Sequence, residues 1–313
     1  MKAAVIERYG PPYSLKIRQM PQPEIGTSEL LVKVSASSVN PVDWKIRQGD
    51  LKIVTGNDFP KILGADFCGE VVAVGAGVSG YEKGDKVFGM ERAVKGGAYA
   101  EYLKVKPSTL APKPAKLSDE EAAALPLAGL TALQGLRDFG RLEKDDKVLI
   151  NGASGGVGTF AVQIAKAMGA HVTGVCSTSK LEMVKLLGAE KVIDYTTEKV
   201  LKPEDKYHLI FDAHGNLSFG EAQKCLYDDG MLVTTLPSVK SILDIGFSKL
   251  QKHKQMKTFF ITPNHADLME LKRLVDEGKL KVVIDKVYPL EELDLAHSYS
   301  ETGHARGKIA ISI

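Results

Sequence analysis

The sequence predicts an α/β protein in which a β-rich part is followed by a doubly wound parallel sheet. Two observations support this prediction. Up to about residue 110, short apolar or alternating runs are separated by Gly and Pro, as in strands joined by turns. From Lys147 onward, strand-like runs alternate with helix-like runs, which is typical of parallel strands covered by helices. At 313 residues the chain is longer than one typical domain, so we expect two.

The β-rich part contains strand candidates and little helical periodicity. The candidates lie at 29–39, 68–78, 85–90 and 98–105. A helix-rich segment begins where Ser118 is followed by Glu121, the spacing of a capping box, before a stretch rich in Ala and Leu. Pro126 interrupts this stretch, so we expect one short helix and then a second.

The second part alternates strands and helices. Strands are predicted at 147–151, 171–177, 191–195, 207–213, 230–236 and 257–262, and helices at 159–169, 180–188 and 218–230. After Pro263, an amphipathic helix at 266–280 precedes strands at 282–290 and 307–313, which we expect to return to the first domain. The expected domains are therefore 1–120 completed by 263–313, and 121–262.

Charge and composition narrow the class of function. The 41 basic and 39 acidic residues give a net charge of +2, and no basic stripe is interleaved with aromatic residues, which argues against nucleic acid as a partner. No apolar run approaches the roughly 20 residues that span a bilayer, and the N-terminal segment lacks the pattern of a signal peptide. Cys68, Cys176 and Cys225 are too far apart for close metal-ligand spacing, and we expect buried thiols. We expect a cytoplasmic protein without a membrane span.

The glycine-rich stretch NGASGGVGTF, residues 151–160, follows the first strand of the second part. Gly155 and Gly158 come two and five residues after Ala153, which is the spacing of the dinucleotide fingerprint with Ala in its first position. Gly155 lets the backbone approach a pyrophosphate, Gly158 lets the helix pack on the strand, and the helix N-terminus offers N–H groups. The residues expected to bind the cofactor here are Ser154, Gly155, Gly156 and Val157. The alternative is a tight turn without a ligand.

The end of the next strand indicates which cofactor binds. NAD sites usually end this strand with Asp or Glu, but here it ends at Cys176 and is followed by Ser177, Thr178, Ser179 and Lys180. Hydroxyls and an ammonium can bind a 2′-phosphate that a carboxylate would repel. NADPH is therefore the predicted cofactor, with Ser177 and Lys180 as ligands. The alternative is that Ser179 caps the next helix and Lys180 is solvated.

Seven motifs occur in order along nearly the whole chain: SSVNPVDWKIRQG, LGADFCGEVVAVG, GDKVFG, GGAYAEYLKV, ALPLAGLTAL, GASGGVG and GHARGKIAISI. In these motifs the sequence resembles the medium-chain dehydrogenase/reductase superfamily, in its zinc-free quinone oxidoreductase branch, which includes the ζ-crystallin-like and chloroplast-envelope quinone oxidoreductase homologues. The resemblance implies a GroES-like β domain, a Rossmann domain and an active site in the cleft between them. It also implies a homodimer formed through the strand at 257–262.

The resemblance further implies that no metal is bound. Zinc-dependent relatives have a Cys, a His-Glu pair and a Cys where this chain has Asn40, Ala65 with Asp66, and Leu127. Only Asp66 is a usual ligand, whereas a catalytic zinc needs about three. Without a Lewis acid, hydride transfer to a conjugated acceptor is easier than alcohol oxidation, because negative charge spreads onto a distant oxygen. The expected activity is NADPH-dependent reduction of a quinone or an α,β-unsaturated carbonyl.

Two residues of the segment NPVDWK are the expected catalytic residues. By the resemblance, Asn40 donates a hydrogen bond to the substrate oxygen, and Lys45 supplies positive charge to an oxyanion or contacts the cofactor. Many relatives have Tyr where this chain has Lys45. Asp43, between them, is expected to cap a turn.

Four further residues are expected to contact the cofactor. By the resemblance, Thr131 approaches the nicotinamide, Tyr195 contacts the adenine-side ribose or phosphate, and Leu236 offers backbone groups to the carboxamide. His214 ends a predicted strand at the carboxyl edge of the sheet, where ligands bind. The alternatives are an ordinary helix threonine, a packed surface tyrosine and a loop histidine without a catalytic role.

Two other functions are compatible with the same residues. One is a double-bond reductase of long or bulky enones or ketols, and the other is a catalytically quiet NADPH-binding protein with a structural or regulatory role. A comparison of a naphthoquinone with an alkenal as substrates separates the first from a quinone reductase. Tight NADPH binding without turnover would favour the second.

Overall fold

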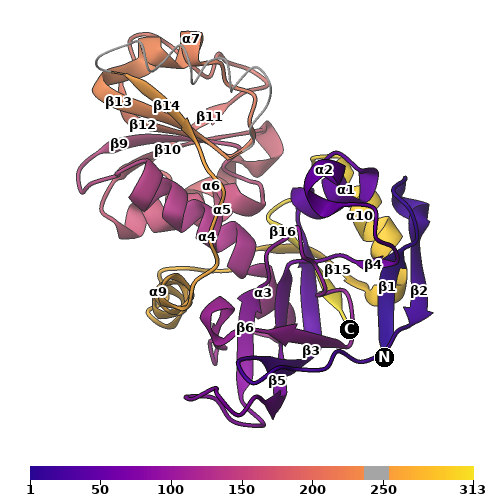
Figure 1. The fold of residues 1–313 in the computed structure, drawn as a ribbon. Coiled ribbons are helices and arrows are strands. Elements are labelled where there is room, and N and C mark those ends of the chain that lie inside the picture. The colour runs from indigo at the N-terminus through magenta and orange to yellow at the C-terminus, as the bar shows by residue number, and fades with distance from the viewer. Residues whose placement is uncertain (236–253) are drawn as a thin grey trace. The chain divides into compact units, whose positions relative to one another are not determined.

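The computed structural model describes residues 1–235 and 254–313, and its chain forms two compact units (Figure 1). The first unit comprises Met1–Ala128, Thr262–Gly278 and Val282–Ile313, and the second comprises Gly129–Ile261 and Lys279–Lys281. The chain passes from the first unit into the second within the helix α4 (Pro126–Gln134).

The first unit is built on a seven-stranded sheet with the order β15-β16-β3-β5-β6-β8 and with β7 paired to β3. Its strands are β3 (Leu30–Val39), β5 (Asp66–Val74), β6 (Lys86–Met90), β7 (Tyr102–Val105), β8 (Leu110–Pro112), β15 (Ile284–Pro289) and β16 (Lys308–Ser312). The C-terminal strand β16 runs antiparallel to β3, with Ile309 opposite Val39. This pairing places Lys308, at the start of β16, beside the end of β3.

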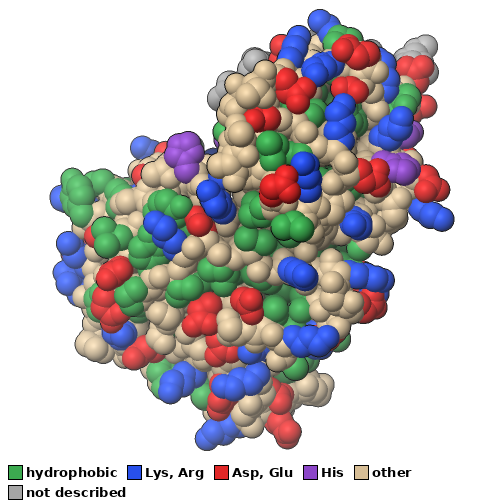
Figure 2. Space-filling view, turned by 180° about the vertical axis from the view of Figure 1, so that it is seen from behind, with side chains coloured by type: hydrophobic (Ala, Val, Ile, Leu, Met, Phe, Trp, Pro, Cys, Tyr) green, Lys and Arg blue, Asp and Glu red, His purple; other side chains and the backbone are tan. Residues whose placement is uncertain are grey.

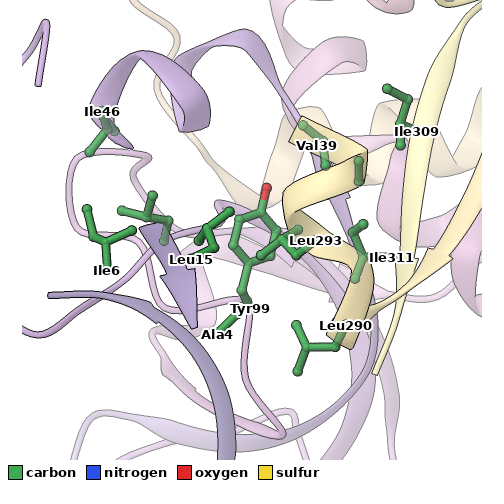
Figure 3. Close-up of a cluster of buried hydrophobic side chains, with 12 residues drawn as sticks. Ala4, Ile6, Leu15, Val39, Ile46, Tyr99, Leu290, Leu293, Ile309 and Ile311 are labelled. Carbon is green, nitrogen blue, oxygen red and sulfur yellow. The ribbon is translucent and has the colours of Figure 1, made fainter. Parts of the chain in front are cut away.

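A second sheet and the helices complete the first unit. The sheet has the order β2-β1-β4, from β1 (Lys2–Ile6), β2 (Leu15–Gln19) and β4 (Lys61–Ile62). The helices are α1 (Pro41–Gln48), α2 (Lys52–Thr55), α3 (Asp119–Ala124), α9 (His265–Asp276) and α10 (Leu293–Glu301). Figure 3 shows a core cluster to which β1, β2, α1 and α10 contribute, with Tyr99 among Leu15, Val39 and Leu293. Tyr99 is fully buried, so its hydroxyl needs a partner inside the protein.

The second unit contains a six-stranded parallel sheet with the order β11-β10-β9-β12-β13-β14 (Figure 1). Its strands are β9 (Lys147–Asn151), β10 (His171–Cys176), β11 (Lys191–Asp194), β12 (Tyr207–Asp212), β13 (Leu226–Thr234) and β14 (Gln255–Thr258). The strand order reverses between β9 and β12, and doubly wound sheets bind ligands at the carboxyl ends of the strands at such a point. The predicted α/β fold class is confirmed.

The helices of the second unit follow the predicted alternation. Among its described residues they are α5 (Gly156–Ala167), α6 (Leu181–Leu186), α7 (Phe219–Ala222) and the later part of α4. The break predicted at Pro126 is confirmed, because α3 ends at Ala124 and α4 begins at Pro126. The predicted capping box is also present, with the backbone N of Glu121 donating to Ser118 Oγ at 3.1 Å.

Several sequence predictions differ from the structure. The helix predicted at 218–230 ends earlier, because β13 begins at Leu226 and passes through a shift in its pairing with β12 near Asp229, which has a φ of 64°. The edge strand predicted at 257–262 is β14, which begins at Gln255. Helices α1 and α10 occupy segments for which the sequence predicts none. Helix α1 starts with Pro41 at its first position, where proline is favoured.

The surface carries charges of both signs. On the face shown in Figure 2, Lys and Arg side chains are interspersed with Asp and Glu side chains. Among residues 1–235 and 254–313, no helix is both long enough and apolar enough to cross a membrane.

Candidate active site

The turn after β9 allows a close approach between backbone segments. Gly152 has a φ of 77°, a conformation that favours glycine. A Cβ on Gly158 would lie 2.0 Å from the carbonyl oxygen of Gly152 and 2.7 Å from the Cα of Ala153. No side chain fits there. Gly158 therefore lets α5 pack against the end of β9, as the dinucleotide fingerprint requires.

The N-terminus of α5 has no side-chain cap. Gly155 is the N-cap residue, and no side-chain hydrogen bond closes the helix. The first N–H groups of a helix have no acceptor within it, so those of Gly156 and Val157 can bind an anion that the helix dipole also attracts. Ser154, which is 8% exposed, precedes the N-cap in the same turn. The four residues predicted to hold a pyrophosphate thus form one continuous turn at a helix N-terminus.

The loop after β12 lies against this glycine turn. A Cβ on Gly152 would lie 3.2 Å from the Cβ of His214, whose side chain is exposed. The buried carboxylate of Asp212 holds the loop, because its Oδ1 accepts hydrogen bonds from the backbone N of Gly215 and from Asn151 Nδ2, both at 2.8 Å. Neither Asn151 nor Asp212 was predicted as a site residue. Both end strands at the carboxyl edge of the sheet, and their sequence position after apolar strands could have indicated them.

The end of β10 carries the side chains expected to bind the 2′-phosphate. Ser177 precedes a short 3-10 turn, and the backbone N of Lys180 donates to Ser177 O at 2.9 Å. Tyr195 follows β11, its backbone N donates to Cys176 O at 3.2 Å, and its side chain is 56% exposed. The structure therefore brings Ser177, Lys180 and Tyr195 together at the carboxyl edge of β10 and β11.

A carboxylate also lies at this edge. Asp194, the last residue of β11, accepts hydrogen bonds from the hydroxyls of Thr178 and Thr196. These hydrogen bonds lower the carboxyl pKa of Asp194, with Thr178 contributing most. The Thr178 hydroxyl is thereby engaged and is not a free phosphate ligand in this conformation. Asp194 was not predicted from the sequence, because the residue that usually distinguishes NAD from NADP ends the second strand, whereas Asp194 ends the third.

The remaining predicted cofactor contacts lie outside these turns. Thr131 is on α4 and is 8% exposed. Leu236 lies outside the residues that the structure describes.

A surface pocket of about 380 Å³ lies at the opposite edge of the same sheet. Lys147, His171 and Tyr207, which begin β9, β10 and β12, are among its lining residues. Ligands of doubly wound sheets bind at the other edge, and charged groups of this pocket pair with each other, as in the contact between Lys191 and Asp205 at 3.3 Å. This pocket therefore lies at the edge of the sheet away from the glycine turn.

In the first unit, Asn40 is the N-cap residue of α1. Its backbone N donates to Asp43 Oδ2 at 2.8 Å, which confirms the capping role expected of Asp43. Lys45 on the same helix has its ammonium 5.6 Å from the ring centroid of Trp44, and within the described part of the chain this ammonium forms no hydrogen bond or ion pair. Five helix positions separate Asn40 and Lys45, a rotation of about 140°, so their side chains leave the helix in different directions.

Asp66 is the centre of a buried polar cluster. Its fully buried carboxylate accepts hydrogen bonds from Ser38 Oγ at 2.6 Å, and from Asn40 Nδ2 and the backbone N of Leu127 at 2.8 Å each. The ammonium of Lys308 lies 3.6 Å from the same carboxylate and donates to Asn40 Oδ1. Burial lowers the pKa of Lys308, and the nearby Asp66 carboxylate counteracts this effect. The cluster therefore contains one cation and one anion, both removed from water.

A second buried chain of polar groups supports α1. Tyr99 Oη donates to Asp43 Oδ2 at 3.1 Å, and His297 Nε2 lies 3.4 Å from Tyr99 Oη. Arg47 Nε donates to His297 Nδ1 at 3.3 Å, which leaves the proton of neutral His297 on Nε2. Burial raises the pKa of Asp43 to about 7 and lowers that of His297 to about 3. Arg47 itself is paired with Glu301.

The positions that correspond to zinc ligands come together around Asp66, but they do not fit a metal. Asp66 contacts both Asn40 and Leu127, and only Asp66 is a usual zinc ligand. Its carboxylate already accepts three hydrogen bonds, and the neighbouring Lys308 ammonium would repel a divalent cation. Among the residues that the structure describes, no group of three or more His, Cys, Asp or Glu could hold a metal ion.

Comparisons with families of known proteins agree with this architecture. A family described as alcohol dehydrogenase GroES-like domain matches residues 26–115, and one described as zinc-binding dehydrogenase matches residues 187–311. A GroES-like domain joined to a doubly wound sheet with a glycine turn defines the class of medium-chain dehydrogenases and reductases.

Individual relatives narrow this class. A chloroplast envelope quinone oxidoreductase homolog of Arabidopsis thaliana is 37% identical over 94% of this chain and 92% of its own length. An NADPH-dependent alkenal/one oxidoreductase of the same plant is 37% identical over 99% of this chain and 79% of its own. The solved structure of the quinone oxidoreductase from Coxiella burnetii has a TM-score of 0.93 and 36% identity, covering 100% of this chain and 99% of that one. The chain belongs to the medium-chain dehydrogenase/reductase superfamily, in its zinc-free quinone oxidoreductase branch.

Proposed function

We propose that this protein is an NADPH-dependent oxidoreductase that transfers a hydride to a quinone or an α,β-unsaturated carbonyl, without zinc. The observation that supports this most is the turn between β9 and α5, whose bare backbone and uncapped helix N-terminus suit a pyrophosphate. The relatives named above are a quinone oxidoreductase homolog and an NADPH-dependent alkenal/one oxidoreductase, which supports the same reaction class.

The proposed cofactor site uses the carboxyl edge of the six-stranded sheet. The N–H groups of Gly156 and Val157 bind the pyrophosphate, with Ser154 and Gly155 in contact, and His214 borders the same turn. NADPH supplies the hydride when it is bound, and the protein binds and orients it. Leu236 is proposed to offer backbone groups to the carboxamide of the nicotinamide, and Thr131 to approach the nicotinamide ring.

The side chains after β10 favour NADPH over NADH. Ser177 and Lys180 offer a hydroxyl and an ammonium to the 2′-phosphate, and the exposed ring of Tyr195 can lie against the adenine-side ribose. Cys176 stands where an NAD site would have a carboxylate. Asp194 weakens this preference for NADPH, because its negative charge lies beside Thr178 and would repel the 2′-phosphate.

On the substrate side, charge is proposed to be stabilised by side chains in place of a metal. A conjugated acceptor carries negative charge on its oxygen after it receives the hydride, and hydrogen-bond donors placed in advance stabilise that charge. Asn40 is the proposed donor, and Lys45 supplies an ammonium with no other ionic partner in the described structure. The Asp66 and Lys308 pair beside Asn40 supports a reaction without zinc.

We also propose a cytoplasmic homodimer. Within the described residues, strand β14 ends the order of the six-stranded sheet, so its outer N–H and C=O groups are the proposed site of pairing with a second copy. Light scattering behind size-exclusion chromatography tests this, and a monomer at working concentration would contradict it.

The activity is tested by following NADPH oxidation by the purified protein with a panel of quinones, enals and enones. We expect turnover with at least one acceptor, and the ratio of kcat/KM for a naphthoquinone and an alkenal decides between quinone and double-bond reduction. A panel without turnover would contradict the proposal. Tight NADPH binding in that case would support a catalytically quiet NADPH-binding protein instead.

A further inference from the structure

The side-chain amide of Asn40 lies between two charged groups, and each of them can hydrogen-bond to only one end of the amide. The carboxylate of Asp66 has no hydrogen to donate, so it can bond only to Nδ2, at 2.8 Å. The ammonium of Lys308 has no lone pair to offer, so it can bond only to Oδ1. Both contacts are satisfied in one orientation of the amide, and both are lost if the amide turns over.

We propose that Asp66 and Lys308 are positioning residues that lock the Asn40 amide in one orientation, leaving its second N–H as a hydrogen-bond donor for the substrate oxygen. This inference rests on the proposed reduction of a quinone or enone. The amide oxygen is withdrawn onto Lys308, so the amide cannot present a lone pair to the developing oxyanion. A donor that is fixed before the reaction needs no reorganisation when the charge develops.

The burial of the cluster makes this orientation rigid. Asp66 is fully buried, Asn40 is 2% exposed and Lys308 is 3% exposed. Water therefore has little access to replace either partner, and an unpaired buried charge would be costly. Lys308 is further held by the backbone carbonyl of Val39, to which its ammonium donates at 3.3 Å.

The same carboxylate also holds the start of α4. Asp66 Oδ1 accepts the backbone N–H of Leu127, one of the helix N–H groups that has no acceptor within the helix. Oδ2 binds Asn40 and Ser38. One buried anion thus fixes both α1, through its N-cap residue, and the N-terminus of α4. The Lys308 ammonium, 3.6 Å from Oδ2, balances the charge of this anion.

The first test compares two substitutions of Lys308. Lys308→Arg keeps a positive charge and donors for Asn40 Oδ1, whereas Lys308→Met removes both. We expect Lys308→Arg to retain kcat within about threefold and Lys308→Met to lower kcat about tenfold. In both variants the KM for NADPH and the Kd for NADPH should be unchanged. Equal kcat values for the two variants would overturn the proposal. A parallel loss of NADPH binding in Lys308→Met would also overturn it, because it would indicate general structural damage.

The second test removes both charges together. Asp66→Asn/Lys308→Met leaves the net charge of the cluster unchanged but frees the amide to turn over, and we expect kcat to fall about tenfold or more. The matched control is Glu70→Gln/Lys86→Met, which removes an exposed ion pair at 2.9 Å from the same sheet and should leave kcat within about twofold. Thermal melting shows whether each variant is folded.

A third measurement needs no turnover. In protein labelled with ¹⁵N-asparagine, the Asn40 side-chain amide is assigned by its loss in Asn40→Leu. We expect one amide proton to be shifted downfield by the Asp66 carboxylate, and this shift to disappear in Asp66→Asn/Lys308→Met. An Asn40 amide with the averaged shifts of a solvated side chain would refute the locked orientation. If the NMR data show a locked amide but the wild type reduces no acceptor, the proposed reaction is wrong, whereas the positioning of Asn40 by Asp66 and Lys308 is still supported.

Discussion

The two units differ in the polar groups that form their candidate sites: backbone groups in the second unit and buried side chains in the first. In the second unit, the glycine turn offers backbone N–H groups and excludes side chains, since a Cβ on Gly158 would lie 2.0 Å from Gly152 O. In the first unit, the cluster around Asp66 consists of buried polar and charged side chains that contact one another. Its members Asn40 and Lys308 are 268 positions apart in the chain. A substitution in the glycine turn should therefore act by local steric conflict. A substitution in the cluster should act by breaking the hydrogen bonds of the neighbouring polar side chains.

The largest effect is expected in the glycine turn. Gly158→Ala should lower the free energy of unfolding by about 3 kcal/mol and weaken NADPH binding about 100-fold, because the new methyl group collides with backbone that cannot move aside. Gly220→Ala is the matched control, since a Cβ there meets nothing within 4 Å. Fluorescence titration and thermal melting measure both quantities. Wild-type NADPH affinity in Gly158→Ala would show that the cofactor binds elsewhere.

A smaller effect is expected where the second unit does use side chains. Lys180→Glu should weaken NADPH binding about 30-fold, since it replaces the proposed charge-assisted hydrogen bond to the 2′-phosphate with repulsion, and should change NADH binding about twofold. The control is Lys185→Glu, a charge reversal at an exposed site on α6. Equal losses for the two cofactors would contradict the assignment of the 2′-phosphate to this turn.

The first unit predicts an effect of pH on stability. Burial raises the pKa of Asp43 to about 7, so the native state keeps a proton that the unfolded chain releases, and this group destabilises the fold as pH rises from about 4 to 7. Burial lowers the pKa of His297 to about 3, so that group stabilises the fold as pH rises from about 3 to 6.5. The two slopes oppose each other between about pH 4 and 6.5.

Asp43→Asn should reveal the contribution of His297 to the pH dependence of the free energy of unfolding. Relative to wild type, its free energy of unfolding should rise by about 1.4 kcal/mol per pH unit between about pH 4.5 and 6. His297→Gln should show the reverse slope. Urea unfolding at several pH values measures both, and parallel curves for wild type and Asp43→Asn would mean that Asp43 is ionised in the native state.

The smallest effect is expected from the carboxylate at the edge of the cofactor site. Asp194→Asn removes a negative charge beside Thr178 and should raise the preference for NADPH over NADH about threefold, as expected for a partly screened charge. Asp205→Asn, at the opposite edge of the sheet, is the control. An unchanged preference in Asp194→Asn would place the 2′-phosphate away from Thr178.

The sequence predicted the features that depend on neighbours along the chain. The alternation from Lys147 onward, the break at Pro126 and the capping by Ser118 are set by periodicity and local sterics, and all are present. The helix predicted at 218–230 failed in its second half, because pairing of Leu226 with β12 overrides the local helical pattern. The contact between Asp194 and Thr178 was not predicted for a related reason, since it depends on the pairing of β10 with β11.

By itself, the sequence determined the α/β class and the glycine turn, because these follow from residue types and short spacings. Its resemblance to a known family indicated that the usual zinc ligands are missing. The tertiary structure alone decided that Lys308 reaches Asn40 and Asp66, that Tyr99 and His297 support Asp43, and that His214 borders the glycine turn. Those contacts join segments that the sheets bring together. Buried charges must find partners wherever the fold places them, and no local pattern records which partners those are.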